Sequence, residues 1–233
     1  MKIKVFALRA WHSLKRVFFV LFFLQFIYIL LLKWIDPPIT VTQLGSWLHG
    51  DGLKRNYIHQ RDISPYARLA VMASEDQLFP DHNGFDWKSI GEAIAYNKKK
   101  PRRIRGASTI SQQVAKNVFL WQGRSWIRKG LEVYFTFMIE LVWGKKRILE
   151  MYLNVAEMGK GIFGIEAASR EYFRKSSAKL TPAEAAMIAA SLPNPKKYTV
   201  KPLSIYVSRR YPWVIQQMGF LQDDPDIKQL VKP

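Results

Sequence analysis

The chain has 233 residues, with 36 lysines and arginines against 18 aspartates and glutamates, which gives a formal net charge of +18. This length allows one full domain with a short appendage, and the 48% hydrophobic content excludes a disordered basic tail. The absence of cysteine excludes disulfides and thiol nucleophiles, and the positive charge predicts an anionic partner: nucleic acid, an anionic lipid surface or a phosphate-bearing substrate.

The first predicted element is a membrane anchor over residues 17–35. Residues 17–32 carry no charge, and Arg16 and Lys33 border them. A full membrane span needs about 20 residues, and long basic side chains at its ends can reach the interface. A cleaved secretory signal is disfavoured because KWIDPP follows where small residues should be, and a buried core helix because the stretch is apolar all round.

The basic residues before the anchor predict its orientation. Positions 1–16 contain five lysines and arginines and no acidic residue. Positive residues stay in the cytoplasm, so we expect residues 1–16 to be a cytoplasmic tail and residues from about 36 onward to lie outside. The part beyond residue 33 keeps 30 basic against 18 acidic residues, a net charge of +12. Nucleic acid is therefore excluded as a partner, and an anionic lipid or a phosphorylated lipid substrate is favoured.

The external part is predicted to be one mainly α-helical domain over residues 60–218. Residues 36–59 are expected to form a linker, with an extended piece at 39–42 and a loop at 45–52. Ser64-Pro65 and Thr181-Pro182 are typical of helix starts, and the second adds a capping box with Glu184.

Apolar residues spaced by three or four predict the remaining helices of the external domain. The expected ranges are 125–143, 146–158, 162–173 and about 203–218, the last with a kink at Pro212. Residues 219–233 are expected to form a C-terminal tail.

Glu75 is the first candidate catalytic residue. Leu69, Met72 and Glu75 follow one another at i, i+3 and i+6, so the carboxylate extends an apolar stripe. A desolvated carboxylate has a raised pKa, which suits a general base, whereas the alternative is a solvated glutamate beyond the helix end. Residues 75–86 (EDQLFPDHNGFD) add further titratable groups, among them His82, which is a metal ligand or an ordinary hydrogen-bonding residue.

Two further segments carry candidate substrate-binding residues. In 106–117 (GASTISQQVAKN), hydroxyls and amides suit sugar hydroxyls and phosphate oxygens; the alternative is a polar surface helix capped by Ser108 or Thr109. In 128–132 (RKGLE), two cations beside an acid would bind a diphosphate, although an exposed ion pair is the ordinary interpretation. Gly130 costs about 1 kcal/mol inside a helix, so we expect a close approach there.

Two short motif matches are disfavoured. Residues 159–164 satisfy the G-x-G-x-x-G pattern of dinucleotide sites but follow a segment that reads as a helix rather than a strand. Residues 176–179 satisfy the acylation pattern S-x-x-K, but the motifs that accompany it are missing.

Five segments together resemble the family 51 glycosyltransferases, the peptidoglycan glycosyltransferases that also form the N-terminal half of bifunctional penicillin-binding proteins. The segments are 75–86, 106–117, 128–132, 146–173 and 180–198, in the family's order, and the match covers roughly residues 60–215. Because the chain stops at residue 233 after one anchor, it most resembles the monofunctional members. The resemblance implies a lysozyme-like helical fold and an inverting, single-displacement polymerisation of lipid II into β-1,4-linked glycan, with release of polyprenyl diphosphate.

The resemblance also implies roles for individual residues. Glu75 would be the general base that deprotonates the acceptor hydroxyl, and Glu132 the second essential carboxylate. The other matched positions would support the base or bind substrate: Asp76, Phe79, His82, Ser108, Thr109, Gln112, Gln113, Lys116, Arg128 and Lys129. The sequence requires no cofactor and marks no cluster of metal ligands, although Mg²⁺ or Mn²⁺ would fit on the diphosphate.

The implied partners are lipid II, the growing glycan strand, the bilayer and other cell-wall synthesis proteins. The implied location is the bacterial inner membrane, with the domain on its periplasmic or outer face. Aromatic-rich stretches at 119–126 and 133–138 would hold the domain against the bilayer, or would all be core. Two other functions stay open: a lysozyme-like hydrolase or lytic enzyme, which needs no diphosphate-binding cations, and a non-enzymatic anchored scaffold.

Overall fold

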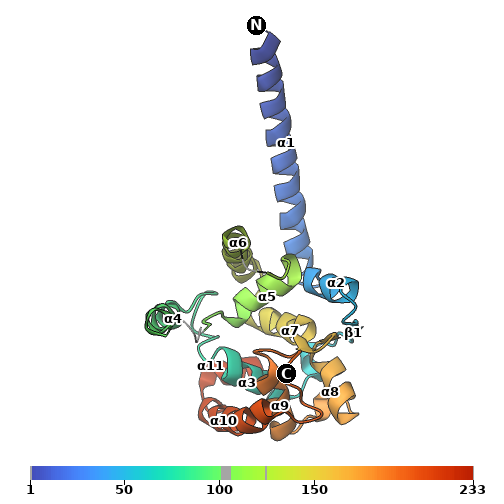
Figure 1. The fold of residues 1–233 in the computed structure, drawn as a ribbon, viewed down its shortest axis with the longest axis vertical. Helices are drawn as coiled ribbons and strands as arrows, with labels where there is room; N and C mark the ends of the chain where they lie inside the picture. Colours follow the sequence, from blue (N-terminus) through green and yellow to red (C-terminus); the bar gives the residue numbers. More distant parts are fainter. Residues whose placement is uncertain (1, 101–105, 124, 233) are drawn as a thin grey trace. The chain divides into compact units, whose positions relative to one another are not determined.

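The computed structural model describes residues 2–100, 106–123 and 125–232, with side chains from residue 11 onward. The chain divides into two compact units, Met1–Pro37 and Pro38–Pro233. Among the described residues, α-helices predominate and strands are few and short (Figure 1), which confirms the prediction of a mainly α-helical protein.

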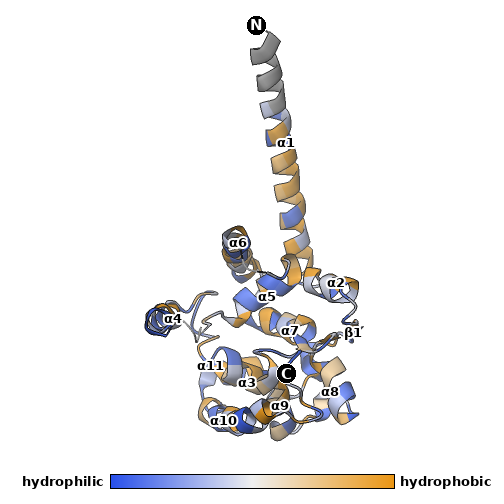
Figure 2. Cartoon of the chain, in the orientation of Figure 1, coloured by the Kyte–Doolittle hydropathy of each residue, from blue (hydrophilic) through white to orange (hydrophobic). Residues whose placement is uncertain are grey.

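The first unit contains the long helix α1 (Lys2–Leu31). Its stretch Trp11–Leu31 is the one helical segment among the described residues that is long and apolar enough to cross a membrane. At 1.5 Å per residue, 21 residues cover about 31 Å, close to the thickness of a hydrocarbon core. Figure 2 shows the apolar residues along this stretch. The helix continues through Lys15 and Arg16 because lysine and arginine are good helix formers, so the change in hydropathy there is no helix boundary.

The second unit holds the other helices and a small sheet. Its α-helices are α2 (Val41–Leu48), α3 (Pro65–Glu75), α4 (Trp87–Lys99), α5 (Ile110–Phe119), α6 (Trp126–Val142), α7 (Lys145–Val155), α8 (Ile165–Phe173), α9 (Pro182–Ser191), α10 (Ile205–Leu221) and α11 (Pro225–Val231). Two short 3₁₀ helices span Gln60–Asp62 and Ser177–Lys179.

Capping residues set several of these helix starts, and the sequence predicts those of α3 and α9. The Ser64 hydroxyl accepts the backbone N–H of Tyr66 at the start of α3, and Ser125 caps α6. Thr181 and Glu184 form the capping box of α9. These hydrogen bonds satisfy N–H groups that have no partner inside the helix, so each start is fixed by local chemistry.

The predicted linker at 36–59 contains structure that the sequence prediction missed. Residues expected to be extended or looped form α2, whose start is a capping box between Thr40 and Gln43. The pattern Thr-x-x-Gln is a capping box as much as Thr-x-x-Glu is, and it precedes a short amphipathic stretch. The predicted C-terminal tail is also wrong in part, because α11 packs on α3 and buries Ile227 and Leu230.

A three-stranded sheet lies beside α8, in the order β1 (Lys54–Arg55), β3 (Ile162–Phe163), β2 (Glu157–Gly159). The β1 and β3 strands are parallel, whereas β2 and β3 form an antiparallel hairpin. The helix predicted to reach residue 158 therefore ends at Val155, and the one predicted from residue 162 begins at Ile165.

The glycines of the G-x-G-x-x-G match lie in this hairpin and, for Gly164, at the N-cap of α8. Gly161 has φ of +67°, and a Cβ there would lie 2.2 Å from the carbonyl oxygen of Asp51. Gly164 has φ of +84°, and a Cβ there would lie 2.6 Å from the carbonyl oxygen of Asn154. A tight turn and close backbone packing therefore account for these two glycines.

Two groups of helices meet in the second unit. One group packs α3 against α9, α10 and α11, and the other packs α5 against α6 and α7, with α2 also on α5 (Figure 1). Buried side chains such as Phe79, Tyr152 and Phe163 fill the interior. The C-terminal end of α3 and the N-terminal half of α5 approach each other, and the candidate site is built where they meet.

Candidate active site

Asp76 organises the loop that follows α3. Its side chain is 4% exposed, and the carboxylate accepts hydrogen bonds from His82 Nε2 at 3.0 Å and from the backbone N–H of Ile110 at 2.9 Å. His82 Nδ1 in turn accepts the backbone N–H of Gly84, which places the ring proton on Nε2, toward Asp76. The aspartate therefore joins the end of α3 to the start of α5 and fixes the loop between α3 and α4.

Lys145, at the start of α7, supports the same loop through a hydrogen bond to its backbone. Its ammonium group donates to the backbone carbonyl of His82 and to Glu140 Oε1 at 2.7 Å. It also lies 4.6 Å from the centre of the Phe79 ring, which is fully buried. Phe79 is thus a packing residue beneath the site, and Lys145 is a supporting residue that the sequence prediction missed.

Glu75 is the last residue of α3, and its carboxylate is partly buried. Oε2 accepts a hydrogen bond from Gln113 Nε2 at 2.8 Å, and Oε1 accepts a longer one from the Ser74 hydroxyl at 3.4 Å. Burial raises the pKa of Glu75, and the hydrogen bonds and the charge of Arg210 offset only part of this effect. A carboxylate with uncharged donors and a raised pKa suits the acceptance of a proton.

Gln113 is oriented by a residue that the sequence prediction missed. Its Oε1 accepts a hydrogen bond from the hydroxyl of Tyr152 on α7 at 3.2 Å, so its amide N–H points toward Glu75. Burial and the nearby acidic charges raise the pKa of Tyr152 well above its ordinary value, and the phenol therefore remains a donor. No local pattern marks Tyr152, which reaches the site through the packing of α7 on α5.

The side chains of Thr109 and Gln112 form hydrogen bonds at the start of α5. They form its capping box, and the Thr109 hydroxyl donates to the carbonyl of Gly84 at 2.7 Å. Both side chains are buried. Their hydrogen bonds in this structure position α5 and the loop after α3, as the alternative of an N-capped helix predicts. Ser108 is exposed just before the helix.

Glu132 lies on α6 between two cations. Its oxygens accept hydrogen bonds from Arg128 Nη1 at 2.6 Å and from Lys129 Nζ at 2.5 Å. The Glu132 and Arg128 side chains are only 4% and 12% exposed, so this is no ordinary surface pair, whereas Lys129 is 41% exposed. The expected close approach at Gly130 is wrong, because a Cβ there would have no neighbour within 4 Å.

Lys116 lies on α5, three residues after Gln113, and its charge interacts with both candidate carboxylates. Burial is the largest cause of its lowered pKa, the charges of Arg128 and Lys129 act in the same direction, and those of Glu132 and Glu75 act in the opposite direction. The ammonium group is therefore within electrostatic reach of both glutamates. Because α5 also contacts Glu75 through Gln113 and packs on α6, the helix of Glu132, the two glutamates form one candidate site.

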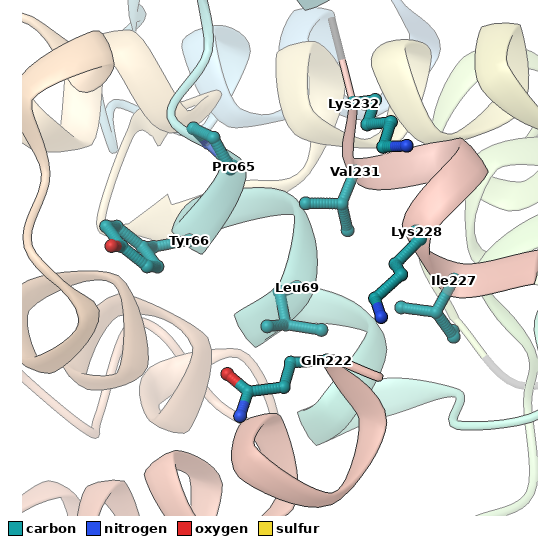
Figure 3. A pocket seen from close by; sticks show the side chains of 8 residues that line it. All are labelled: Pro65, Tyr66, Leu69, Gln222, Ile227, Lys228, Val231 and Lys232. Carbon is teal, nitrogen blue, oxygen red and sulfur yellow. The ribbon is translucent and has the colours of Figure 1, made fainter. Parts of the chain in front are cut away.

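A separate pocket of about 180 Å³ lies between the start of α3 and α11 (Figure 3). Its wall includes Leu69, Ile227 and Val231, with Lys228 and Lys232 as its charged side chains. None of the predicted site residues lines this pocket.

Comparison with known proteins gives one consistent result. The family model for transglycosylases matches residues 42–219. The biosynthetic peptidoglycan transglycosylase of Yersinia pseudotuberculosis serotype O:3 (strain YPIII) is 53% identical over 197 residues, which are 82% of each chain. The protein of the same name from Mannheimia succiniciproducens is 60% identical over 166 residues, 71% of this chain and 68% of the relative. That from Yersinia pestis (strain Pestoides F) is 52% identical over 197 residues, 82% of each chain.

Proposed function

The chain belongs to the transglycosylase family and is a peptidoglycan glycosyltransferase, and we propose that it polymerises lipid II into β-1,4-linked glycan strands. The observation that carries this proposal is the asymmetry of the two glutamates. Glu75 has uncharged hydrogen-bond donors and a raised pKa, whereas Glu132 is paired with two cations. One side of the site is thus suited to accept a proton and the other to bind an anionic leaving group.

Glu75 acts on the acceptor sugar in the proposed reaction. The acceptor's 4-hydroxyl attacks the anomeric carbon of the donor while its proton passes to the Glu75 carboxylate. The new bond joins O4 to C1, and the bond between C1 and the phosphate oxygen breaks. Attack from the face opposite the α-linked phosphate inverts the centre and gives a β-linkage. Gln113 holds the carboxylate for this step through its hydrogen bond to Oε2.

The cations stabilise the departing polyprenyl diphosphate. Arg128, Lys129 and Lys116 lie on the Glu132 side of the site. Their positive charges stabilise the negative charge that develops on the phosphate oxygens as the diphosphate leaves. Lys129 is more exposed than Arg128, the other cation bound to Glu132, and its ammonium group can turn to a phosphate while the carboxylate stays buried. Glu132 fixes the buried Arg128 before substrate binds and keeps Lys129 within reach of the site.

A divalent cation, Mg²⁺ or Mn²⁺, would enter the site only with the substrate. Both oxygens of Glu132 already accept hydrogen bonds from cationic side chains, and the described residues contain no group of three His, Asp or Glu that could hold a metal ion. The side chains around Glu132 do not form a set of metal ligands, so we derive no step through a metal.

We propose that the domain works against the outer face of the bacterial inner membrane. The apolar segment of α1 suits a single-pass anchor, and the basic residues that precede it favour an N-terminus inside. The second unit also exposes large apolar side chains on α4 and α6: Trp87, Trp126, Ile127, Phe137 and Leu141. Such side chains suit insertion into the interface, where a lipid-linked substrate lies. In the described part of 119–126 and 133–138, Phe135 instead stacks on Phe119.

Purified full-length protein, incubated separately with lipid II and with preformed cell wall, tests this function against the two alternatives. Long glycan that a lysozyme then digests is the expected product. Shortened glycan from preformed wall, with lipid II unchanged, would indicate a hydrolase, and no change in either substrate would indicate a scaffold. The cations beside Glu132 count against the hydrolase, because attack by water on a glycan releases no diphosphate.

A further inference from the structure

The α10 helix brings a guanidinium group to the Glu75 side of the site that the mechanism above does not use. Arg210 and Gln217 are seven residues apart on α10, so two helical turns place them on the same side. Gln217 Oε1 accepts a hydrogen bond from Gln77 Nε2 at 3.1 Å, which holds this side of α10 against the loop that starts beyond Glu75. Since α10 also packs along α3, Arg210 lies toward the helix that carries Glu75.

The Arg210 side chain is held by an aromatic ring. Its Cζ lies 3.7 Å from the centre of the Trp213 ring, three residues further along the helix. Its Nε is buried and has no hydrogen-bond partner among the described residues. A guanidinium stacked on indole keeps its charge and loses much of its freedom to move. Arg210 is therefore a permanent positive charge in a fixed place.

A positive charge near Glu75 would offset the groups that oppose its ionisation. The charged and titratable groups that face it come from four helices: Asp76 after α3, Lys116 on α5, Tyr152 on α7 and Arg210 on α10. Burial and the charge of Asp76 oppose ionisation of Glu75, and so does its place at the negative end of the α3 dipole. Arg210 is the positive charge that lowers the pKa of Glu75, whereas the charge of Lys116 is shared with Glu132.

We propose that Arg210 is a positioning residue for the catalytic base: its fixed charge keeps the Glu75 carboxylate ionised near neutral pH, without contact with the substrate. The inference rests on the proposed function to the extent that Glu75 is the base. It adds a residue of α10 to a site otherwise built from α3, α5, α6 and α7. An arginine suits this role because it does not lose its proton in a protein.

The direct test is a titration of Glu75 by carboxyl ¹³C NMR in the full-length protein, with Glu75→Gln used to assign the signal. Arg210→Gln and Arg210→Met should move the Glu75 midpoint to higher pH, and Arg210→Lys should restore it most of the way. Arg209→Gln removes the same charge from an exposed neighbour and should leave the midpoint unchanged. Equal midpoints in wild type, Arg210→Gln and Arg210→Met would overturn the proposal. Because this readout uses no substrate, it holds even if lipid II proves to be the wrong substrate.

The rate of polymer synthesis gives a second readout. At acidic pH, kcat/KM of Arg210→Gln should fall about 3- to 10-fold, which is the size of effect expected when one charge near a partly buried carboxylate is removed. On the alkaline plateau it should approach the wild-type value, and Arg210→Met should behave alike. A loss of equal size at every pH would mean that Arg210 binds substrate or supports the fold, and would overturn a role through Glu75.

Discussion

Replacing Asp76 by alanine should remove the central support of the loop after α3. The carboxylate is buried and accepts hydrogen bonds from His82 Nε2 at 3.0 Å and from the backbone N–H of Ile110 at 2.9 Å. A hydrogen bond to a charged group contributes about 1.5–3 kcal/mol, and the truncation also leaves the Ile110 N–H without a partner. We therefore expect Asp76→Ala to lower the free energy of unfolding by about 3–5 kcal/mol.

Thermal unfolding followed by far-ultraviolet circular dichroism measures this loss. In a domain of this size, 1 kcal/mol shifts the midpoint by about 2–4 °C, so Asp76→Ala should melt roughly 6–20 °C below wild type. Asp81→Ala is the matched control, since Asp81 is exposed on the same loop and its removal should change stability by less than about 0.5 kcal/mol. If the two variants melted together, the hydrogen bonds of Asp76 would not hold the loop and its assigned role would be wrong.

Three further predictions concern other parts of the site. Lys116→Met should abolish polymer synthesis and leave the thermal unfolding midpoint equal to or above that of wild type. Burial lowers the pKa of Lys116, so its charge destabilises the native state near neutral pH. A clearly lower midpoint would contradict this. Gly84→Ala should lower stability to denaturant by about 1–3 kcal/mol, since φ is +87° and the new Cβ would lie 2.8 Å from Thr136 Cγ2; unchanged stability would refute this. Burial raises the pKa of Glu75, so the native state binds more protons than the unfolded state between the ordinary and the raised value. Across that window the stability of wild type relative to Glu75→Gln should fall as pH rises, and a difference independent of pH would show that Glu75 has no raised pKa.

Local chemistry made several parts of the structure predictable from sequence. Ser64 and Thr181 fix helix starts through hydrogen bonds within their own helices, and no distant residue is needed to recognise them. Glu75 could be placed at the end of an apolar stripe for the same reason. Arg128 and Glu132 are four residues apart on one helix, so their contact follows from helical geometry.

The remaining features depend on tertiary packing. Tyr152 and Arg210 reach the site because α7 packs on α5 and α10 packs on α3, and neither contact has a signature in the residues around it. The hairpin at 157–163 interrupts a pattern that is typical of a helix. Its strand β3 pairs with β1, which lies about a hundred residues earlier in the chain. The close approach predicted at Gly130 was wrong because a helical glycine on the surface needs no neighbour that fills the space of a side chain.

The most direct test of the central claim is the rate at which Glu75→Gln makes polymer from lipid II. The side chain keeps its size and can no longer take up the hydroxyl proton, so we expect synthesis to fall to background while the helical circular dichroism stays as in wild type. Polymer made by the folded variant at the wild-type rate would show that another group removes the proton, and the roles proposed for the two glutamates would fail with it.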